Sequence, residues 1–441
     1  MLNYLSKKER GQVLVLFALG LVVLLGFTAL AVDGAMVYSD RRFDQSAADS
    51  AAMSGAAAAG QYLSTHPFSC ADTTFKSNTI SNAQSAASVN AFPALPDQTS
   101  NTSTWTFGVS FDCNSTDNYL DVHVKISSET KTSFAHLFYG GHLINNVEST
   151  VRVLDSQPYA AGNAIVALDS KCTKDGVDWK GGGNGNTVIH EGSIFSNSCM
   201  NKSGGAGDIN VSGTGGKTYG SFYQNGYSCT GHCDNPPFSP AAAPTGGPIN
   251  VPELLASIPQ VNCDNVADHV SVGHSLYLKD NVGPGRYNGG TGDIYLTQPG
   301  LYCIYGDITL SGGHNVLHGE NVTLYFVNGG IKNTGNADLD LTAPIKGVGD
   351  TGLDAGIVGM VILMAPNNSS TLVLLGNDTS DIVGTVMAPY GEVQIGGSSN
   401  STAYHSQIIG FNVLFNGTGT VEVYYDDSKL YHNPAVMTQY K

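Results

Sequence analysis

The sequence predicts an N-terminal transmembrane α-helix with an Ala-rich extension, then a small α+β module, and then a mostly β region. Three observations predict this class. They are an uncharged apolar run near the N-terminus, an Ala-rich segment directly after it, and short apolar runs between turn residues in the rest of the 441-residue chain, which contains 54 glycines. Short strands separated by turns are typical of a solenoid or a sandwich. We expect a parallel β-helix or solenoid-like region, with a β-sandwich as the alternative.

The apolar run from Val13 to Val32 contains no charged residue, and Lys7, Lys8 and Arg10 precede it. At a rise of about 1.5 Å per residue, about 20 helical residues span about 30 Å, the hydrocarbon thickness of a bilayer. The positive-inside rule assigns residues 1–12 to the cytoplasm. The residues after the apolar run then lie outside the cytoplasmic membrane or at the cell surface. The residues that represent this expected single-pass membrane anchor are Val13, Leu19, Leu25 and Val32.

Two other interpretations of the N-terminus stay open. Ala29-Leu30-Ala31 matches the small-residue cleavage site of a secretory signal peptide, but the apolar run is long for one. A processed type IV prepilin would be cut after Gly11, but the Glu that prepilins usually carry five residues later is missing. The length of the apolar run, which is sufficient to span a bilayer, favours the membrane anchor over both alternatives.

The segment that follows the apolar run continues as a helix to about Gly60. It lacks Pro and is rich in Ala, the best helix former. A face of small side chains lets a second helix approach closely. We therefore predict helix packing on this face, and the alternative is a short stalk without a partner. The predicted packing residues are Ala47, Ala48, Ala51, Ala52 and Gly55.

Breaks in composition divide the rest of the chain. His66-Pro67 ends the helix, and alternating apolar and polar residues in Trp105–Phe111 and Leu120–Ile126 indicate half-buried strands. Prolines concentrate between Asp234 and Pro259, which indicates a linker. The expected segments are a cytoplasmic tip (1–12), the transmembrane and Ala-rich helix (13–60), a small α+β module (61–157), a β-rich Gly/Asn region (158–233), a Pro-rich linker (234–260), a β-solenoid-like domain (261–428) and a tail (429–441).

The cysteines and the net charge limit the possible partners. The formal net charge of −16 argues against nucleic acid, because nucleic-acid binding needs clustered Lys and Arg. All eight cysteines follow the apolar run, which predicts disulfides in an exported region. A zinc site at Cys229-x3-Cys233 is the weaker alternative because no second close pair follows, so we expect no metal and no cofactor. The simplest pairing is sequential: Cys70–Cys113, Cys172–Cys199, Cys229–Cys233 and Cys263–Cys303.

The stretch from Arg10 to Ala58 resembles the TadE/TadG-like proteins of Flp (tight-adherence) pilus assembly. That family's signature is an Arg-Gly-Gln start, an apolar span, an Asp just after it, and an Ala-rich helix with Gln and Asp. Residues 120–154 also resemble the family's following module, and residues 285–427 are similar to solenoid-like domains of pilus-linked proteins. The signature positions are occupied here by Arg10, Gly11, Gln12, Asp33, Arg41, Arg42, Gln45, Ala47, Ala48, Asp49, Ala51, Ala52, Gly55 and Ala56.

The resemblance implies a structural or assembly component of a Tad/Flp-type pilus or a related cell-surface apparatus. It would meet the membrane and other subunits of the apparatus through its N-terminal helix, with a homo-oligomer as a further option. Many TadG-type proteins carry a von Willebrand A domain with an Asp-x-Ser-x-Ser metal motif. That motif does not occur in this sequence, so the resemblance implies a variant without metal-dependent adhesion of that kind.

We predict that the chain is not an enzyme and has no catalytic residues. A lyase-like solenoid needs carboxylate-bound Ca²⁺ and a basic residue, but Arg286 is the only Arg after Arg152, and Lys332 lies beside no evident acidic cluster. Asp338-x-Asp340 places two carboxylates on one strand face, where a solvated surface is the simpler interpretation. Exposed Tyr and Asn could bind glycans. The alternative function is therefore an envelope-tethered glycan-binding, less readily glycan-cleaving, solenoid adhesin.

Overall fold

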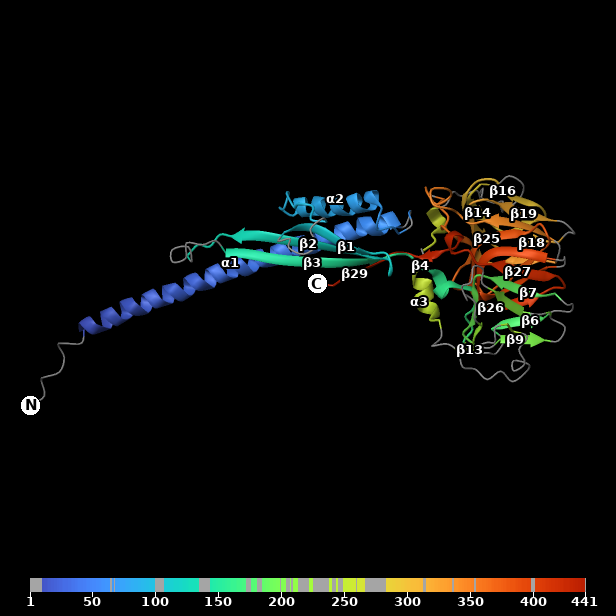
Figure 1. Ribbon diagram of the computed structural model, residues 1–441, viewed down its shortest axis with the longest axis horizontal. Coiled ribbons are helices and arrows are strands. Elements are labelled where there is room, and N and C mark those ends of the chain that lie inside the picture. The colour runs from blue at the N-terminus through green and yellow to red at the C-terminus, as the bar shows by residue number, and fades with distance from the viewer. Residues whose placement is uncertain are drawn as a thin grey trace, which may run out of the picture. The chain divides into compact units, whose positions relative to one another are not determined.

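The computed structural model divides the chain into two compact units, which are described separately below. The first unit contains residues 1–156 and 434–441, and the second contains residues 157–433. In chain order the second unit is therefore inserted between two strands of the first (Figure 1). The structure describes residues 10–63, 66, 68–99, 107–134, 143–171, 176–180, 185–198, 200–203, 207, 209–212, 222–224, 238–239, 243–244, 249–258, 260–265, 283–311, 315–334, 337–352, 354–397 and 401–440.

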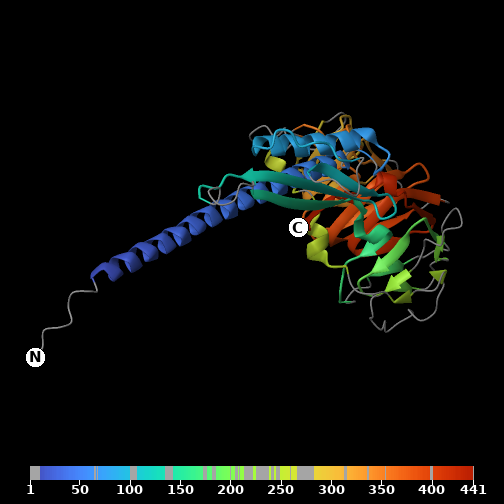
Figure 2. The same ribbon diagram turned by 60° about the vertical axis from the view of Figure 1, so that its left-hand side comes forward.

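Helix α1 runs without interruption over Arg10–Leu63. Its length of 54 residues corresponds to about 80 Å at about 1.5 Å per residue. The apolar run and the Ala-rich segment thus form one helix, as the composition predicts. Figures 1 and 2 show the N-terminal half of α1 extending beyond the sheet of the first unit, while its C-terminal half lies beside that sheet.

The sheet of the first unit is antiparallel and has the strand order β1-β2-β3-β29. Its C-terminal strand falls in the segment that the sequence analysis assigns to a tail. The backbone N–H of Gln98 donates to the carbonyl oxygen of Val109, and the N–H of Val109 donates to the carbonyl oxygen of Pro96, so the residues on either side of Asp97 cover the outer edge of β1. The strands are β1 (Gly108–Asn114), β2 (Tyr119–Thr130), β3 (Leu143–Leu154) and β29 (Val436–Gln439).

Helix α2 (Thr73–Val89) begins where Asp72 caps it. The Asp72 carboxylate accepts hydrogen bonds from the backbone N–H groups of Thr74 (2.8 Å) and Phe75 (3.1 Å). The hydroxyl of Tyr62, at the end of α1, donates to the same carboxylate at 2.6 Å. This hydrogen bond is the main cause that lowers the pKa of Asp72. The cap therefore connects the end of α1 with the start of α2.

The second unit is a stack of parallel strands in three series. Every described strand pair within these series is parallel, as the solenoid interpretation expects and a sandwich of antiparallel sheets does not. The first series is β14 (Gly285–Tyr287), β17 (Gly300–Tyr305), β20 (Val322–Asn328), β23 (Met360–Met364), β25 (Asp381–Gly397), β26 (Ser401–Asn416), β5 (Asn163–Ala167), β8 (Ser193–Ser196), β11 (Phe222–Gln224) and β13 (Ala243–Pro244).

The other two series share the long strands β25 and β26 with the first. The second series adds β16 (Ile294–Leu296), β19 (Val316–Gly319), β22 (Asp338–Thr342), β27 (Thr420–Tyr424), β7 (Thr187–His190), β10 (Ile209–Ser212) and β12 (Phe238–Ser239). In the third, β15 (Gly290–Thr291), β18 (Ile308–Leu310) and β21 (Ile331–Asn333) form a separate three-stranded sheet. The same series continues with β24 (Leu372–Gly376), which pairs with β25, and with β6 (Val177–Lys180) and β9 (Met200–Ser203), which follow β26.

The stack does not follow chain order. Strands β26 and β27, late in the chain, pair with β5, β6 and β7, which come first. The regions 158–233 and 261–428, which the sequence analysis treats as separate segments, therefore lie in one unit. The chain enters and leaves this unit side by side, because β4 (Gln157–Pro158) pairs with β28 (His432–Asn433). Short helices complete it: η2 (Tyr159–Gly162), α3 (Val251–Ala256), η4 (Cys263–Asn265) and η5 (Asp427–Lys429).

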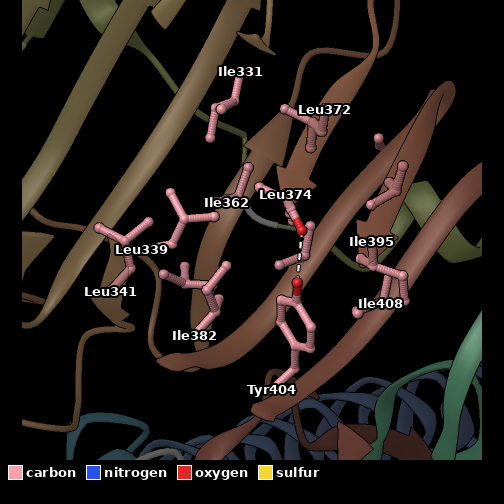
Figure 3. Packing of buried hydrophobic residues seen from close by; sticks show 14 of the residues in the cluster. Ile331, Leu339, Leu341, Ile362, Leu372, Leu374, Ile382, Ile395, Tyr404 and Ile408 are labelled. Carbon is pink, nitrogen blue, oxygen red and sulfur yellow. Dashed lines mark hydrogen bonds between the residues drawn. The ribbon is translucent and has the colours of Figure 1, made fainter. Parts of the chain in front are cut away.

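The core of the second unit consists of stacked aliphatic side chains from the three series. Figure 3 shows some of them around Tyr404, whose side chain lies among the aliphatic residues. The Tyr404 hydroxyl donates a hydrogen bond to the carbonyl oxygen of Leu374 at 2.6 Å, so the only polar atom of this ring has a partner inside the core. The fully buried aliphatic residues of this core include Ile331, Leu339, Leu341, Ile362, Leu372, Leu374, Ile382, Ile395 and Ile408.

Candidate membrane and assembly interface

The N-terminal half of α1 exposes apolar side chains on all sides. Val13 is 67% exposed, Leu19 and Leu25 are each 60% exposed, and Val32 is 42% exposed. A helix that is apolar all round and uncovered by its own chain is typical of a membrane span. In the described part of the chain, α1 is the one helix that is long and apolar enough to cross a membrane.

The small-residue face of α1 is buried inside the first unit. Ala47, Ala48, Ala51 and Ala52 are at most 1% exposed. At Gly55, an added Cβ would lie 3.0 Å from the Cβ of Ala83 in α2 and 3.2 Å from a side-chain carbon of Val122 in β2. The helix that approaches this face is therefore α2 of the same chain. The residues that the sequence analysis assigns to helix packing thus pack within this chain, and contact with other subunits through the N-terminal helix stays a prediction.

Polar residues of α1 hold the β2–β3 hairpin. The carboxylate of Asp33, only 4% exposed, accepts hydrogen bonds from the backbone N–H groups of Ser133 (2.7 Å) and Phe134 (3.0 and 3.2 Å). The Ser128 hydroxyl donates to the buried carboxylate of Asp44 at 2.5 Å. Charge-assisted hydrogen bonds of this kind are among the stronger ones. Two helix positions thus fix the course of one strand and of the chain beyond it.

A second pair of polar side chains adds to this contact. The Gln45 side-chain amide donates to Asp49 at 2.9 Å and to the backbone oxygen of Glu148 in β3 at 3.1 Å. Gln45, Asp49 and Asp33 are signature positions of the resemblance, but the sequence analysis assigns them no contact. The Asp directly after an apolar run is the signal that could have identified Asp33. The residues that it binds are distant in sequence and carry no such signal.

Two disulfides lie in the described residues, one in each unit. Cys70 and Cys113 join the segment before α2 to β1, with a Cα–Cα distance of 5.8 Å. Cys263 and Cys303 join η4 to β17, with a Cα–Cα distance of 6.0 Å. Both follow the sequential pairing. The other four cysteines, Cys172, Cys199, Cys229 and Cys233, lie outside the described residues.

The second series of the second unit carries a row of paired ionisable side chains. The ring of Tyr424 stacks between two histidines, 4.2 Å from His190 and 5.0 Å from His405 between ring centroids. Its hydroxyl donates to Glu422, a hydrogen bond that raises the pKa of Tyr424. The histidine–carboxylate pairs are His318 with Asp340 (2.8 Å), His405 with Asp381 (2.7 Å) and His190 with Glu422 (3.3 Å).

The charged residues that the sequence analysis considers as possible catalytic or Ca²⁺-binding groups contact other side chains in the structure. Arg286 contacts Asp264 at 3.2 Å, and Lys332 forms an ion pair with Asp307. Asp340 faces His318, while Asp338 accepts a hydrogen bond from Thr379 at 3.0 Å. No group of three or more His, Cys, Asp or Glu side chains that could hold a metal occurs among the residues that the structure describes.

Together, these features define a class of protein: one long N-terminal helix with an uncovered apolar half, a helix-and-sheet unit built on its other half, and a large parallel stack. Residues 11–58 match the family model described as Tad, putative Flp pilus-assembly TadE/G-like. This match confirms the resemblance for the N-terminal segment. No curated protein and no solved structure matches the chain. The family match and the apolar helix together support a membrane-anchored component of pilus assembly.

Proposed function

We propose that this chain is a structural component of a Tad/Flp-type pilus or a related cell-surface apparatus, anchored in the cytoplasmic membrane by α1. The observation that carries this proposal is the position of the family match. Residues 11–58 include the uncovered apolar half of α1 and the face on which the first unit folds. The basic residues of the N-terminal tip then lie in the cytoplasm, and both folded units lie outside it.

Contacts with other subunits would use surfaces that the chain itself leaves uncovered. The small-residue face of α1 is covered by α2 and the sheet, so partner subunits would meet α1 on its apolar half, within the membrane. Gly20 and Gly26 on this half have nothing within 4 Å of a Cβ position. A homo-oligomer formed through the same segment is part of this proposal. A structural role of this kind requires no catalytic residue.

The test is to shear cells and to map the N-terminal peptide of this protein by mass spectrometry in the sheared and membrane fractions. An intact N-terminus that stays in the membrane supports an anchored assembly component. A chain that begins near Val32, or that is recovered only in sheared or soluble material, would overturn the anchor. The same fractions, solubilised in detergent, show which subunits co-purify with the full-length chain.

A second candidate function is glycan binding by the second unit. The observation that favours it is a groove of about 310 Å³ lined by Tyr295, His318 and Glu320, at one end of the row of histidine–carboxylate pairs. The Tyr295 ring is 38% exposed and is available for stacking on a sugar. A glycan array probed with the full-length protein tests this, with Tyr295→Ala as the variant. Tyr390→Ala, which removes a similarly exposed tyrosine (42%) outside this groove, is the control.

A further inference from the structure

Ser133 and Phe134, which follow the end of β2, lie against α1 at the point where its apolar half ends. Asp33 directly follows Val32 and binds the backbone of Ser133 and Phe134. The Ser133 hydroxyl also lies 3.6 Å from the sulfur of Met36, one turn further along α1. The chain that leaves β2 is thus held at the level where α1 leaves the expected membrane.

The contact of β2 with Asp44 and the contact of the chain beyond β2 with Asp33 agree in their spacing. Asp44 and Asp33 are separated by about 16 Å along the helix, at about 1.5 Å per residue. Ser128 lies in β2 and Ser133 follows three residues after its end, and five residues of chain cover at most about 16 Å at about 3.3 Å per residue. The chain beyond Ser128 therefore runs alongside α1, antiparallel to it, until it reaches Asp33.

The side chain that this arrangement presents is aromatic and uncovered. Phe134 is 42% exposed, and neighbouring positions of α1 expose Met36 (37%) and Tyr38 (65%). Tyr and Trp are enriched at the boundary between hydrocarbon and water, and Phe is among the residues that interfacial segments bury at the boundary between headgroups and acyl chains. Since the apolar half of α1 ends at Val32, a ring held at the level of Asp33 lies at this boundary if α1 spans the bilayer.

We propose that Phe134 contacts the interfacial layer of the bilayer that α1 crosses, and that Asp33 acts as the positioning residue that holds it there. The inference rests on the proposed membrane anchor. A single helix can rotate and tilt in a bilayer, whereas a second contact beside it fixes the rotation. The hairpin would therefore set how the first unit is oriented on the membrane. The bilayer is chosen as the occupant because the site is continuous with the apolar span.

The experiment uses the full-length protein reconstituted in vesicles of phosphatidylcholine and phosphatidylglycerol, with the photo-crosslinking residue benzoylphenylalanine at one position at a time. The positions are 134 for the inference, 25 for the anchor and 107 as the matched control. The exposed fraction of Phe107 is 43%, similar to that of Phe134. Phe107 directly precedes β1, however, and the first residue of β1 pairs with Lys125, well inside β2. We expect lipid adducts at positions 25 and 134 and few at 107.

A second variant tests the role of Asp33. In Asp33→Ala the lipid adduct at position 134 should fall several-fold while the adduct at 25 is unchanged. Asp33→Asn keeps an oxygen that can accept both N–H groups and should restore much of the adduct. The Cys70–Cys113 disulfide, followed by non-reducing electrophoresis, reports whether the first unit still folds.

The outcomes separate the inference from the proposed function. Lipid adducts at 25 without any at 134 would overturn the inference and leave the anchor intact. An absence of adducts at 25 would overturn the anchor, and the inference with it. Crosslinks from 134 to a second protein chain would show that a subunit contact, not the bilayer, covers this ring.

Discussion

The two units of this chain bury their interiors in opposite ways. In the first unit, α1 presents Ala and Gly to α2 and the sheet, so the backbones come close and little side-chain volume lies between them. In the second unit, large aliphatic side chains from successive parallel strands fill the space inside the stack. The first arrangement leaves no room for an added group, and the second leaves a cavity when a group is removed. The same kind of substitution should therefore have different effects in the two units.

The largest effect is expected from a lost side chain in the second unit. Leu374 is fully buried in β24 (Figure 3), so Leu374→Ala should lower the free energy of unfolding of this unit by about 2–5 kcal/mol. Hydrogen-exchange mass spectrometry of the full-length protein in detergent measures the two units separately. Val373→Ala, at the neighbouring and only half-buried position, is the control and should cost much less. Equal losses for both variants would contradict the stacked core.

The next effect tests close packing in the first unit. Gly55→Leu places side-chain atoms where a Cβ alone already lies 3.0 Å from Ala83 and Thr79, and overpacking typically costs about 1–3 kcal/mol. We expect faster exchange in α2 and β2, with unchanged exchange in the second unit. Gly34→Leu is the control, because nothing lies within 4 Å of its Cβ position. Unchanged protection of α2 in Gly55→Leu would contradict the packing.

How far the sequence predicts this architecture depends on the range of the interactions. The helix Arg10–Leu63 and strand β2 follow from local composition and from alternation, and both agree with the prediction. The small-residue face is also local, and only its partner required the structure. The pairing of β26 with β5 joins residues far apart in the chain. Short strands with similar patterns can pair in many orders, so periodicity alone does not determine this one.

The polar contacts and the last strand show the same limit. Asp33 is conspicuous after an apolar run, but the N–H groups that it binds lie about 100 residues away. β29 has four exposed residues with no alternating pattern, and nothing local distinguishes it from a tail. β29 pairs with β3, from which the whole second unit separates it in the sequence, so this pairing is not a local property. The row of histidine–carboxylate pairs likewise depends on register between distant strands.

Removal of β29 should have a smaller effect on the first unit. Deletion of residues 434–441 removes an edge strand and the ring of Tyr440, which lies 4.8 Å from the Arg152 guanidinium. Cross-strand pairs and a cation–π contact of this kind suggest a loss of about 1–2 kcal/mol. Exchange should increase in β3, whereas Tyr440→Ala alone should produce only part of the change. If the deletion leaves β3 as protected as before, β29 contributes no stability as a strand.

The smallest effect is a pH dependence where the chain leaves the second unit. His432 Nε2 lies 3.2 Å from the carboxylate of Asp427, and this hydrogen bond raises the pKa of His432 against the opposing effect of burial. Burial works to raise the pKa of Asp427, but hydrogen bonds from His432 and Tyr425 leave it below its ordinary value.

The sign of the His432 effect follows from its raised pKa. Its contribution to stability is complete below the unfolded pKa of about 6.5 and is lost as the pH rises through the higher folded pKa. The contribution of Asp427 has the opposite sense and is lost as the pH falls through its lowered folded pKa. Because both side chains are partly exposed, the loss on the alkaline side should stay below about 1 kcal/mol. Thermal unfolding between about pH 6 and pH 8 measures it. His432→Asn should remove the slope without affecting the first unit, and a slope that persists in this variant would assign it to another group.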